Sequence, residues 1–340
     1  MTAAYMIEIE NRLNLKATPV AVKALCFAAP KQMIASVLSE TRSVLLIAAG
    51  ASRPSKRIRV NDDPVEITGG GRDLAYVACR SAQSVDVICP SGLIERIELP
   101  GEPQSLAWNG SYNPAKQKIM VTCQLPGSRN GVVCVIDEET LSVSQTLKVG
   151  KQPRGITLDW QRKHLLVANY GSDSISILDQ VGSRVLATLP TAGRPWIANV
   201  SWSDPNDIMI SLRAGGVLQR MDASQFPPVL SGLAALRKPT EPPTSLTPYC
   251  ALALDEDHLW IVPDQSSESL ALVQSNGEEL KQIGYHQLGK DETGEEGLGQ
   301  VAIIGLGLPG RLCIANRKRK QLIFARISKV KARETRTMPG

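Results

Sequence analysis

The stretch LLVANYGSDSISILD, Leu165 to Asp179, decides the fold. An apolar run of strand length is followed by the polar turn Asn169 to Asp173 and then by a run in which apolar and polar residues alternate. That order is the signature of a β-hairpin. Ninety residues earlier, AYVACRSAQSVDVIC, Ala75 to Cys89, aligns with it without a gap. The chain therefore repeats one hairpin unit.

The hairpin recurs along the chain, and a further strand precedes it. Additional copies run from Met120 to Asp137, from Trp260 to Val273 and from Cys313 to Phe324. A proline leads a short alternating run ahead of most hairpins, with spacings of 39 to 53 residues between successive prolines; these are Pro64, Pro103, Pro153, Pro195 and Pro248. Proline suits the first position of a strand, where its missing N–H costs no ladder bond. A unit of about 40 to 50 residues with four short strands is a β-propeller blade.

We therefore predict an all-β chain that forms a single seven-bladed β-propeller over residues 1–330. The expected blades are 18–60, 61–100, 101–149, 150–190, 191–245, 246–290 and 291–330. The alternating stretch Met6 to Leu15 is expected to supply the strand that closes the ring, because an open sheet edge is an aggregation template.

Two motifs carry a resemblance to a known family. KQPRGITLD, Lys151 to Asp159, and VANYGSDSISILD, Val167 to Asp179, resemble repeats of the YVTN type. Blade 150–190 matches such repeats nearly throughout, and blades 61–100 and 291–330 match in part. The resemblance implies a seven-bladed propeller with lactonase-like or WD-repeat-like architecture. It implies no single function, since this fold hosts enzymes, electron-transfer subunits and binding platforms.

One segment departs from the repeat. Residues 226–248 contain six prolines, so we expect a long Pro-rich surface loop, with one helical turn at Ser231 to Leu236. Residues 331–340 are expected to form a flexible basic tail.

Composition bounds the environment of the protein. Aromatic residues make up only 4% of the chain, so much of the core must be Val, Ile, Leu and Ala. The seven cysteines are odd in number and form no CxxC motif, which favours buried free thiols in a reducing compartment. There is no signal-peptide pattern at the start and no run of 18 apolar residues. We expect a cytoplasmic protein that does not contact a membrane.

Signals for catalysis are few. The chain has three histidines and no HExxH, CxxCH or GxSxG motif, and the glycines from Gly69 to Gly71 are not followed by a P-loop lysine. We assign no catalytic residue, no metal site and no cofactor. Binding residues are expected at the mouth of the central channel, directly after the leading prolines; these are Gln104, Arg154, Trp196 and Tyr249.

Positive charge is concentrated near the C-terminus. The segment from Arg311 to Gly340 holds ten Lys or Arg residues and one acid, whereas the rest of the chain is mildly acidic. We expect a basic interaction edge where blade 7 meets blade 1, formed by Arg53, Lys56, Arg57, Arg317, Lys318, Arg319, Lys320, Lys329, Lys331 and Arg333. Such an edge attracts an acidic protein or a nucleic acid.

Three functional hypotheses follow. The preferred one is a non-catalytic scaffold or adaptor subunit that binds another protein within a larger assembly. The first alternative is a lactonase-like hydrolase, in which Arg154 binds an anionic substrate and Trp196 or Tyr249 stacks on it. The second alternative is a nucleic-acid-associated accessory protein that uses the basic edge. The absence of a catalytic motif favours the first hypothesis over an enzyme.

Overall fold

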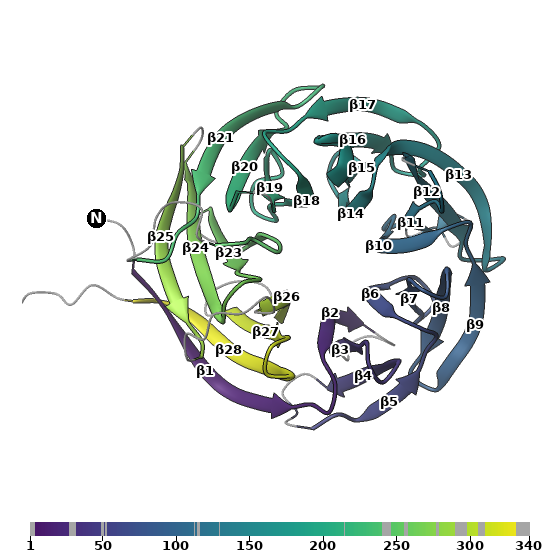
Figure 1. Ribbon diagram of the computed structural model, residues 1–340, viewed down its shortest axis with the longest axis horizontal. Helices are drawn as coiled ribbons and strands as arrows, with labels where there is room; N and C mark the ends of the chain where they lie inside the picture. Colours follow the sequence, from purple (N-terminus) through teal and green to yellow (C-terminus); the bar gives the residue numbers. More distant parts are fainter. Residues whose placement is uncertain are drawn as a thin grey trace, which may run out of the picture.

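Twenty-eight strands form seven four-stranded sheets around a central opening (Figure 1). This count refers to the part of the chain that the computed structural model describes, which is residues 4–26, 32–48, 51, 53–111, 113, 116–128, 130–213, 215–239, 246–254, 258–276, 279–289, 298–304 and 310–330. Helical geometry is rare in those residues; the short 3-10 turn η2 (Tyr170–Ser172) is described in full. The predicted seven-bladed propeller is confirmed.

Each of the first four blades holds four consecutive antiparallel strands. Blade 1 consists of β2 (Pro19–Cys26), β3 (Gln32–Leu38), β4 (Ser43–Ala48) and β5 (Lys56–Arg59). Blade 2 consists of β6 (Pro64–Gly69), β7 (Ala75–Cys79), β8 (Ser84–Cys89) and β9 (Gly92–Glu98). Blade 3 consists of β10 (Glu102–Trp108), β11 (Lys118–Gln124), β12 (Asn130–Asp137) and β13 (Ser142–Lys151). Blade 4 consists of β14 (Pro153–Asp159), β15 (His164–Asn169), β16 (Ser174–Asp179) and β17 (Val185–Pro190).

The last blade is completed by the start of the chain. Blade 5 consists of β18 (Pro195–Val200), β19 (Asp207–Leu212), β20 (Val217–Asp222) and β21 (Val229–Ala235). Blade 6 consists of β22 (Leu252–Ala253), β23 (Leu259–Pro263), β24 (Ser269–Asn276) and β25 (Glu279–Gln287). Blade 7 consists of β26 (Leu298–Ile304), β27 (Gly310–Asn316), β28 (Gln321–Val330) and β1 (Ala4–Asn14). Because β1 pairs with β28, the ring closes as expected.

The core lies between neighbouring blades, in apolar clusters that join two sheets. In β15, Val167 packs towards blade 3 with Val133, whereas the next residue, Ala168, packs towards blade 5 with Ala198. Successive side chains of a strand point to opposite faces of its sheet. Both faces of the strand are therefore buried, which explains why Leu165 to Ala168 forms a continuous apolar run.

The segment 226–248 differs from its expected form. Residues Val229 to Ala235 form β21, the outer strand of blade 5, where a helical turn at Ser231 to Leu236 was expected. The strand pairs with β20 from Val217↔Ala235 to Asp222↔Val229. This backbone ladder outweighs a weak local preference for a helical turn. The helical-turn prediction is wrong, while residues 240–245 and the tail 331–340 lie outside the described residues.

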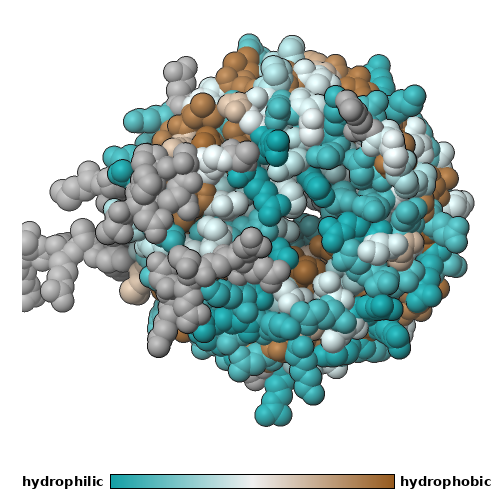
Figure 2. Space-filling view, in the orientation of Figure 1, coloured by the Kyte–Doolittle hydropathy of each residue, from teal (hydrophilic) through white to brown (hydrophobic). Residues whose placement is uncertain are grey.

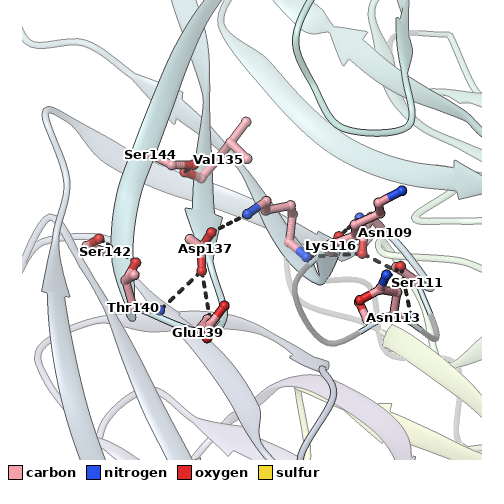
Figure 3. Close-up of polar contacts among 11 residues, drawn as sticks. Asn109, Ser111, Asn113, Lys116, Val135, Asp137, Glu139, Thr140, Ser142 and Ser144 are labelled. Carbon is pink, nitrogen blue, oxygen red and sulfur yellow. Dashed lines mark hydrogen bonds and ion pairs between the residues drawn. The ribbon is translucent and has the colours of Figure 1, made fainter.

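The turns at the end of the blades remote from the leading prolines are closed by aspartates. Asp137, the last residue of β12, accepts hydrogen bonds from the backbone N–H groups of Glu139 (2.8 Å) and Thr140 (3.1 Å) (Figure 3). Asp179 and Asp222 end the corresponding strands of blades 4 and 5 and accept backbone N–H groups of the turns that follow them. Such local bonds stabilise the turns. We therefore assign these aspartates to the fold.

Two expectations from composition have structural counterparts. Six cysteines are described as free thiols; Cys89 is half-buried and the others are buried, namely Cys79, Cys123, Cys134, Cys250 and Cys313. Within the described residues, no helix has the length and apolar character needed to cross a bilayer.

Candidate functional site

The leading prolines fix which residues meet at one end of the ring. In each of four blades the proline at the start of the first strand lies opposite the last residue, or the last but one, of the second strand. The pairs are Pro64 and Cys79, Pro103 and Cys123, Pro153 and Asn169, and Pro195 and Leu212. The register of each pair shifts directly after the proline, so the residue that follows the proline lies in an irregularity of the strand, at the same end of the blade as the residue that follows the proline's partner. We call this end of the ring the channel mouth.

The structure brings together all four residues expected at the channel mouth. Gln104, Arg154, Trp196 and Tyr249 come from blades 3 to 6 and line one cavity of about 320 Å³. The Arg154 guanidinium donates a hydrogen bond of 2.5 Å to Oε1 of Gln104. On the face drawn in Figure 2, the centre of the ring remains open and hydrophilic residues lie around much of it.

A second set of residues lines the same cavity; the sequence analysis did not expect them there and assigned one of them, Arg317, to the basic edge. Its members follow the second strand of their blades; they are Ser39, Arg80, Arg213, Gln265 and Arg317. In the alignment of the hairpins, Arg80 and Arg317 occupy the same repeat position as Tyr170. That alignment is the signal that could have found them, because residues at one repeat position share one place around the ring.

Two arginines of the cavity, Arg213 and Arg154, form cation–π contacts with an aromatic ring. The guanidinium of Arg213 lies 4.2 Å from the ring centre of Trp196, and that of Arg154 lies 5.3 Å from it. Burial, followed by Arg80 and Arg213, lowers the pKa of Arg154. Burial also lowers the pKa of Arg213, and Arg317 contributes in the same direction. Since guanidinium groups stay protonated in proteins, these residues form a crowded positive site that an anion relieves.

The opposite wall of the cavity carries a carboxylate. Glu66 accepts hydrogen bonds of 3.2 and 3.1 Å from the side-chain amide of Gln300, whose own oxygen accepts the N–H of Val22 at 3.0 Å. Burial raises the pKa of Glu66, and Lys23 partly offsets this. The neighbouring Cys250 is a neutral thiol, because burial raises its pKa to about 12.

An open groove of about 550 Å³ adjoins the cavity, and Lys151, Tyr170 and Arg194 lie along it. The Tyr170 ring has the Arg194 guanidinium 5.5 Å from its centre and the Arg154 guanidinium at 5.8 Å. We call Lys151, Arg154, Arg194 and Arg213 the blade 4–5 cation cluster; Lys151 is included as the last residue of β13 in blade 3, directly before blade 4. Among the residues that the structure describes, no carboxylate lies within ion-pair distance of these four.

The basic edge expected between blades 7 and 1 is divided by the structure. Residues 317–320 form the turn between β27 and β28 at the channel mouth, next to blade 1, where Lys320 pairs with Glu40 at 2.9 Å. Arg53 lies in the connection between β4 and β5, and the alternation of antiparallel strands places that connection at the opposite end. Lys56 and Arg57 are exposed on the outer strand β5. The described residues of the expected edge therefore lie at separate places, and their role in binding a partner stays a prediction.

The remaining basic residues add little to such an edge. Lys329 is near the end of β28, away from the turn 317–320. Arg319 is paired with the buried carboxylate of Glu268 at 2.6 Å. Lys331 and Arg333 lie outside the described residues.

The histidines do not converge on the cavity. His164 starts β15 and packs against Phe226, with ring centres 5.4 Å apart, and His258 has the positive φ of a turn residue. The described residues contain no group of three or more His, Cys, Asp or Glu side chains placed to hold a metal ion.

Comparisons with known proteins identify the fold alone. No known protein family and no curated protein matches the sequence. Among solved structures, the chain is similar to Kuenenia stuttgartiensis hydrazine synthase, with a TM-score of 0.70 at 12% identity over 95% of this chain and 98% of that one. A chain of the mitotic checkpoint complex gives a TM-score of 0.70 at 11% identity, covering 95% of each chain. A chain from the complex of BBS1N with ARL6DN gives 0.68 at 10% identity, covering 94% of this chain and 96% of that one. The YVTN resemblance gains no support beyond the shared propeller fold.

Proposed function

We propose that this protein is a non-catalytic scaffold or adaptor subunit that binds an acidic segment of a protein partner at the channel mouth. The observation that carries the proposal is the blade 4–5 cation cluster, four positive side chains none of which forms an ion pair among the described residues; Asp173, which lines the same groove, and Glu102 act on them only from beyond ion-pair distance. Like charges held together raise each other's electrostatic energy, and an acidic segment lowers it. Two of the three similar solved structures come from complexes, the mitotic checkpoint complex and BBS1N with ARL6DN, which is compatible with a scaffold.

The arrangement suits an acidic peptide better than a nucleic acid. Binding of a single strand requires a basic track together with exposed aromatic faces on which bases stack. In the cluster, Tyr170 and Trp196 already have guanidinium groups over their rings. The four cations also gather within three adjacent blades, 3 to 5, where a short peptide can reach all of them.

A binding titration tests the proposal. Fluorescence anisotropy is measured with a labelled oligo-glutamate peptide and its oligo-glutamine counterpart, for wild type and for the double variant Lys151→Ala/Arg194→Ala. We expect wild type to bind the acidic peptide only, and the double variant to lose about tenfold or more in affinity, equivalent to ~1.4 kcal/mol. The difference should shrink as salt is raised, because exposed charges are screened within ~8 Å at physiological ionic strength.

The matched control removes two positive charges elsewhere on the same end of the ring. Lys318→Ala/Lys320→Ala changes the net charge equally but lies in the turn of blade 7. Equal losses of affinity in the two double variants would reduce the cluster to a net-charge effect and overturn the proposal. Wild type that hydrolyses lactones, with activity lost in Glu66→Gln, would replace it with the lactonase-like alternative.

A further inference from the structure

The cavity of the central channel carries opposite charges that do not neutralise each other. Arg154 and Arg213 lie on the wall formed by blades 4 and 5, and Glu66 lies on blade 2. The hydrogen bonds of the Glu66 carboxylate go to Gln300 and to the N–H of Ile67. None of the three charged groups forms an ion pair within the described residues.

Tyr249 lines the same cavity, and charged groups of both signs act on it. Burial raises the pKa of the Tyr249 hydroxyl, Glu66 raises it further, and Arg317 and Arg213 lower it. The hydroxyl is therefore within electrostatic range of the carboxylate and of the guanidinium groups. By contrast, Lys23 is the charged group that acts on Glu66 itself. The opposite charges thus come from different blades of one cavity, and no ion pair joins them within the described residues.

Neither a simple anion nor a simple cation satisfies such a cavity. An anion bound by Arg154 and Arg213 leaves the Glu66 carboxylate with no ion pair inside the cavity and only the longer-range attraction of Lys23, and a second negative group placed near Glu66 is repelled. The Nε of Arg154 is buried and has no hydrogen-bond partner among the described residues, so it is available to an acceptor. A volume of about 320 Å³ suits a small molecule.

We propose that the channel cavity binds a small zwitterion, whose carboxylate or other anionic group contacts Arg154 and Arg213 and whose ammonium group contacts Glu66. Free amino acids and other amino-carboxylates belong to this class. This site shares Arg154 and Arg213 with the proposed peptide site but goes beyond it, because Glu66 lies in the channel cavity, whereas Lys151 and Arg194 line the outer groove.

Matched probes of equal length test the charge pattern. Isothermal titration calorimetry is run with the ω-amino acids from glycine to 6-aminohexanoate, and with the dicarboxylate and the diamine that match each chain length. We expect at least one ω-amino acid to bind about tenfold or more tightly than its matched dicarboxylate and diamine, a factor of ten being ~1.4 kcal/mol. A panel in which no ω-amino acid binds, or in which the dicarboxylate binds as well, would overturn the proposal.

Variants that remove one charge each test which residue binds the ammonium group and which binds the anionic group of the zwitterion. Glu66→Gln should abolish the preference for the amino acid over the dicarboxylate, and Arg213→Gln should weaken binding of the amino acid about tenfold or more. Glu139→Gln, an exposed carboxylate at the other end of blade 3, is the control and should leave binding unchanged. An amino-acid preference retained by Glu66→Gln contradicts the site, and if that variant fails to fold, Arg213→Gln still decides.

The same variants separate this site from the peptide site. Lys151→Ala/Arg194→Ala should leave zwitterion binding unchanged while it weakens binding of the oligo-glutamate peptide, and Glu66→Gln should do the reverse. Loss of both ligands in every variant would indicate a general defect and contradict the separation.

Discussion

Basic residues gather at two places on the channel-mouth end of the ring, and their surroundings differ. In the turn of blade 7, Arg319 pairs with buried Glu268 and Lys320 pairs with Glu40. In the blade 4–5 cation cluster, Arg154 and Arg213 have aromatic rings and other arginines as neighbours. The first region has the higher density of positive charge along the sequence, but the second has more positive charge left for a partner. Charge already paired within the fold contributes to stability, and unpaired charge is available for binding.

Removing one arginine from each region should have unequal effects on stability. Arg319→Ala leaves the Glu268 carboxylate, which is 3% exposed, with Asn316 as its remaining side-chain partner. We expect a loss of about 2–4 kcal/mol, somewhat below the usual cost of breaking a buried pair because Arg319 is partly exposed. Arg213→Ala should change stability by less than ~1 kcal/mol, since the lost cation–π contact is offset by relief of repulsion among arginines. Urea unfolding of both variants measures the difference.

The comparison fails if both variants unfold at the same urea concentration. A second substitution identifies the cause of the loss. Glu268→Gln added to Arg319→Ala should recover part of the stability, because the unpaired buried charge is then gone. A loss that persists unchanged would assign the effect of Arg319 to packing of its aliphatic stem.

Glu66 extends the comparison to the channel, because it is a carboxylate that leaves the cation cluster unpaired. Its pKa is raised in the folded protein by burial. The neutral form is therefore favoured by folding, and this contribution, fully present below the unfolded pKa of about 4.3, is lost as the pH rises through the folded pKa. Relative to wild type, Glu66→Gln should gain stability with rising pH over that window, by on the order of 1 kcal/mol.

Chemical denaturation of wild type and Glu66→Gln across pH 4 to 8 measures this difference. The buried carboxyls of Asp86 and Glu138 also have raised pKa values, but both proteins contain them, so their contribution cancels. The groups that face Glu66 are Lys23, Gln300, Tyr249 and Cys250. A difference that does not vary with pH would mean that Glu66 is ionised in the folded protein over the whole range.

Because the chain is built from repeats, the propeller ring and some of the residues at the channel mouth could be predicted from the sequence. The leading prolines fixed the phase of each blade, so Gln104, Arg154, Trp196 and Tyr249 could be expected at one place. Arg213 was missed because the hairpin of blade 5 aligns poorly with the others, although its position is the one that Arg80 occupies in blade 2. Strand β21 was not predicted for the same reason, and because prolines precede and follow it in the sequence.

Pairing between blades lay beyond sequence reasoning. Glu268 and Arg319 are 51 residues apart and belong to different blades, and their contact depends on how two sheets pack. The number of Lys and Arg residues from residue 311 onwards therefore shows where positive charge is concentrated. It does not show how much of that charge is left unpaired for a binding partner. The residues of the expected basic edge are also separated in space, because Arg53 and the turn 317–320 follow strands that end at opposite ends of the ring.

Lys320 offers the smallest and most local test of the paired region. Its ammonium group and the Glu40 carboxylate are both about half exposed, at 44% and 48%. The hydrogen bond from Lys320, followed by that from Thr18, lowers the pKa of Glu40. Lys320→Ala should therefore raise the pKa of Glu40 towards its ordinary value, while the melting temperature moves by less than ~2 °C because exposed pairs contribute little. Carboxyl-detected NMR titration of Glu40 and a thermal melt measure the two quantities. An unchanged Glu40 pKa would mean that Lys320 is free in solution, and the blade 7 turn would then hold one more cation open to a partner.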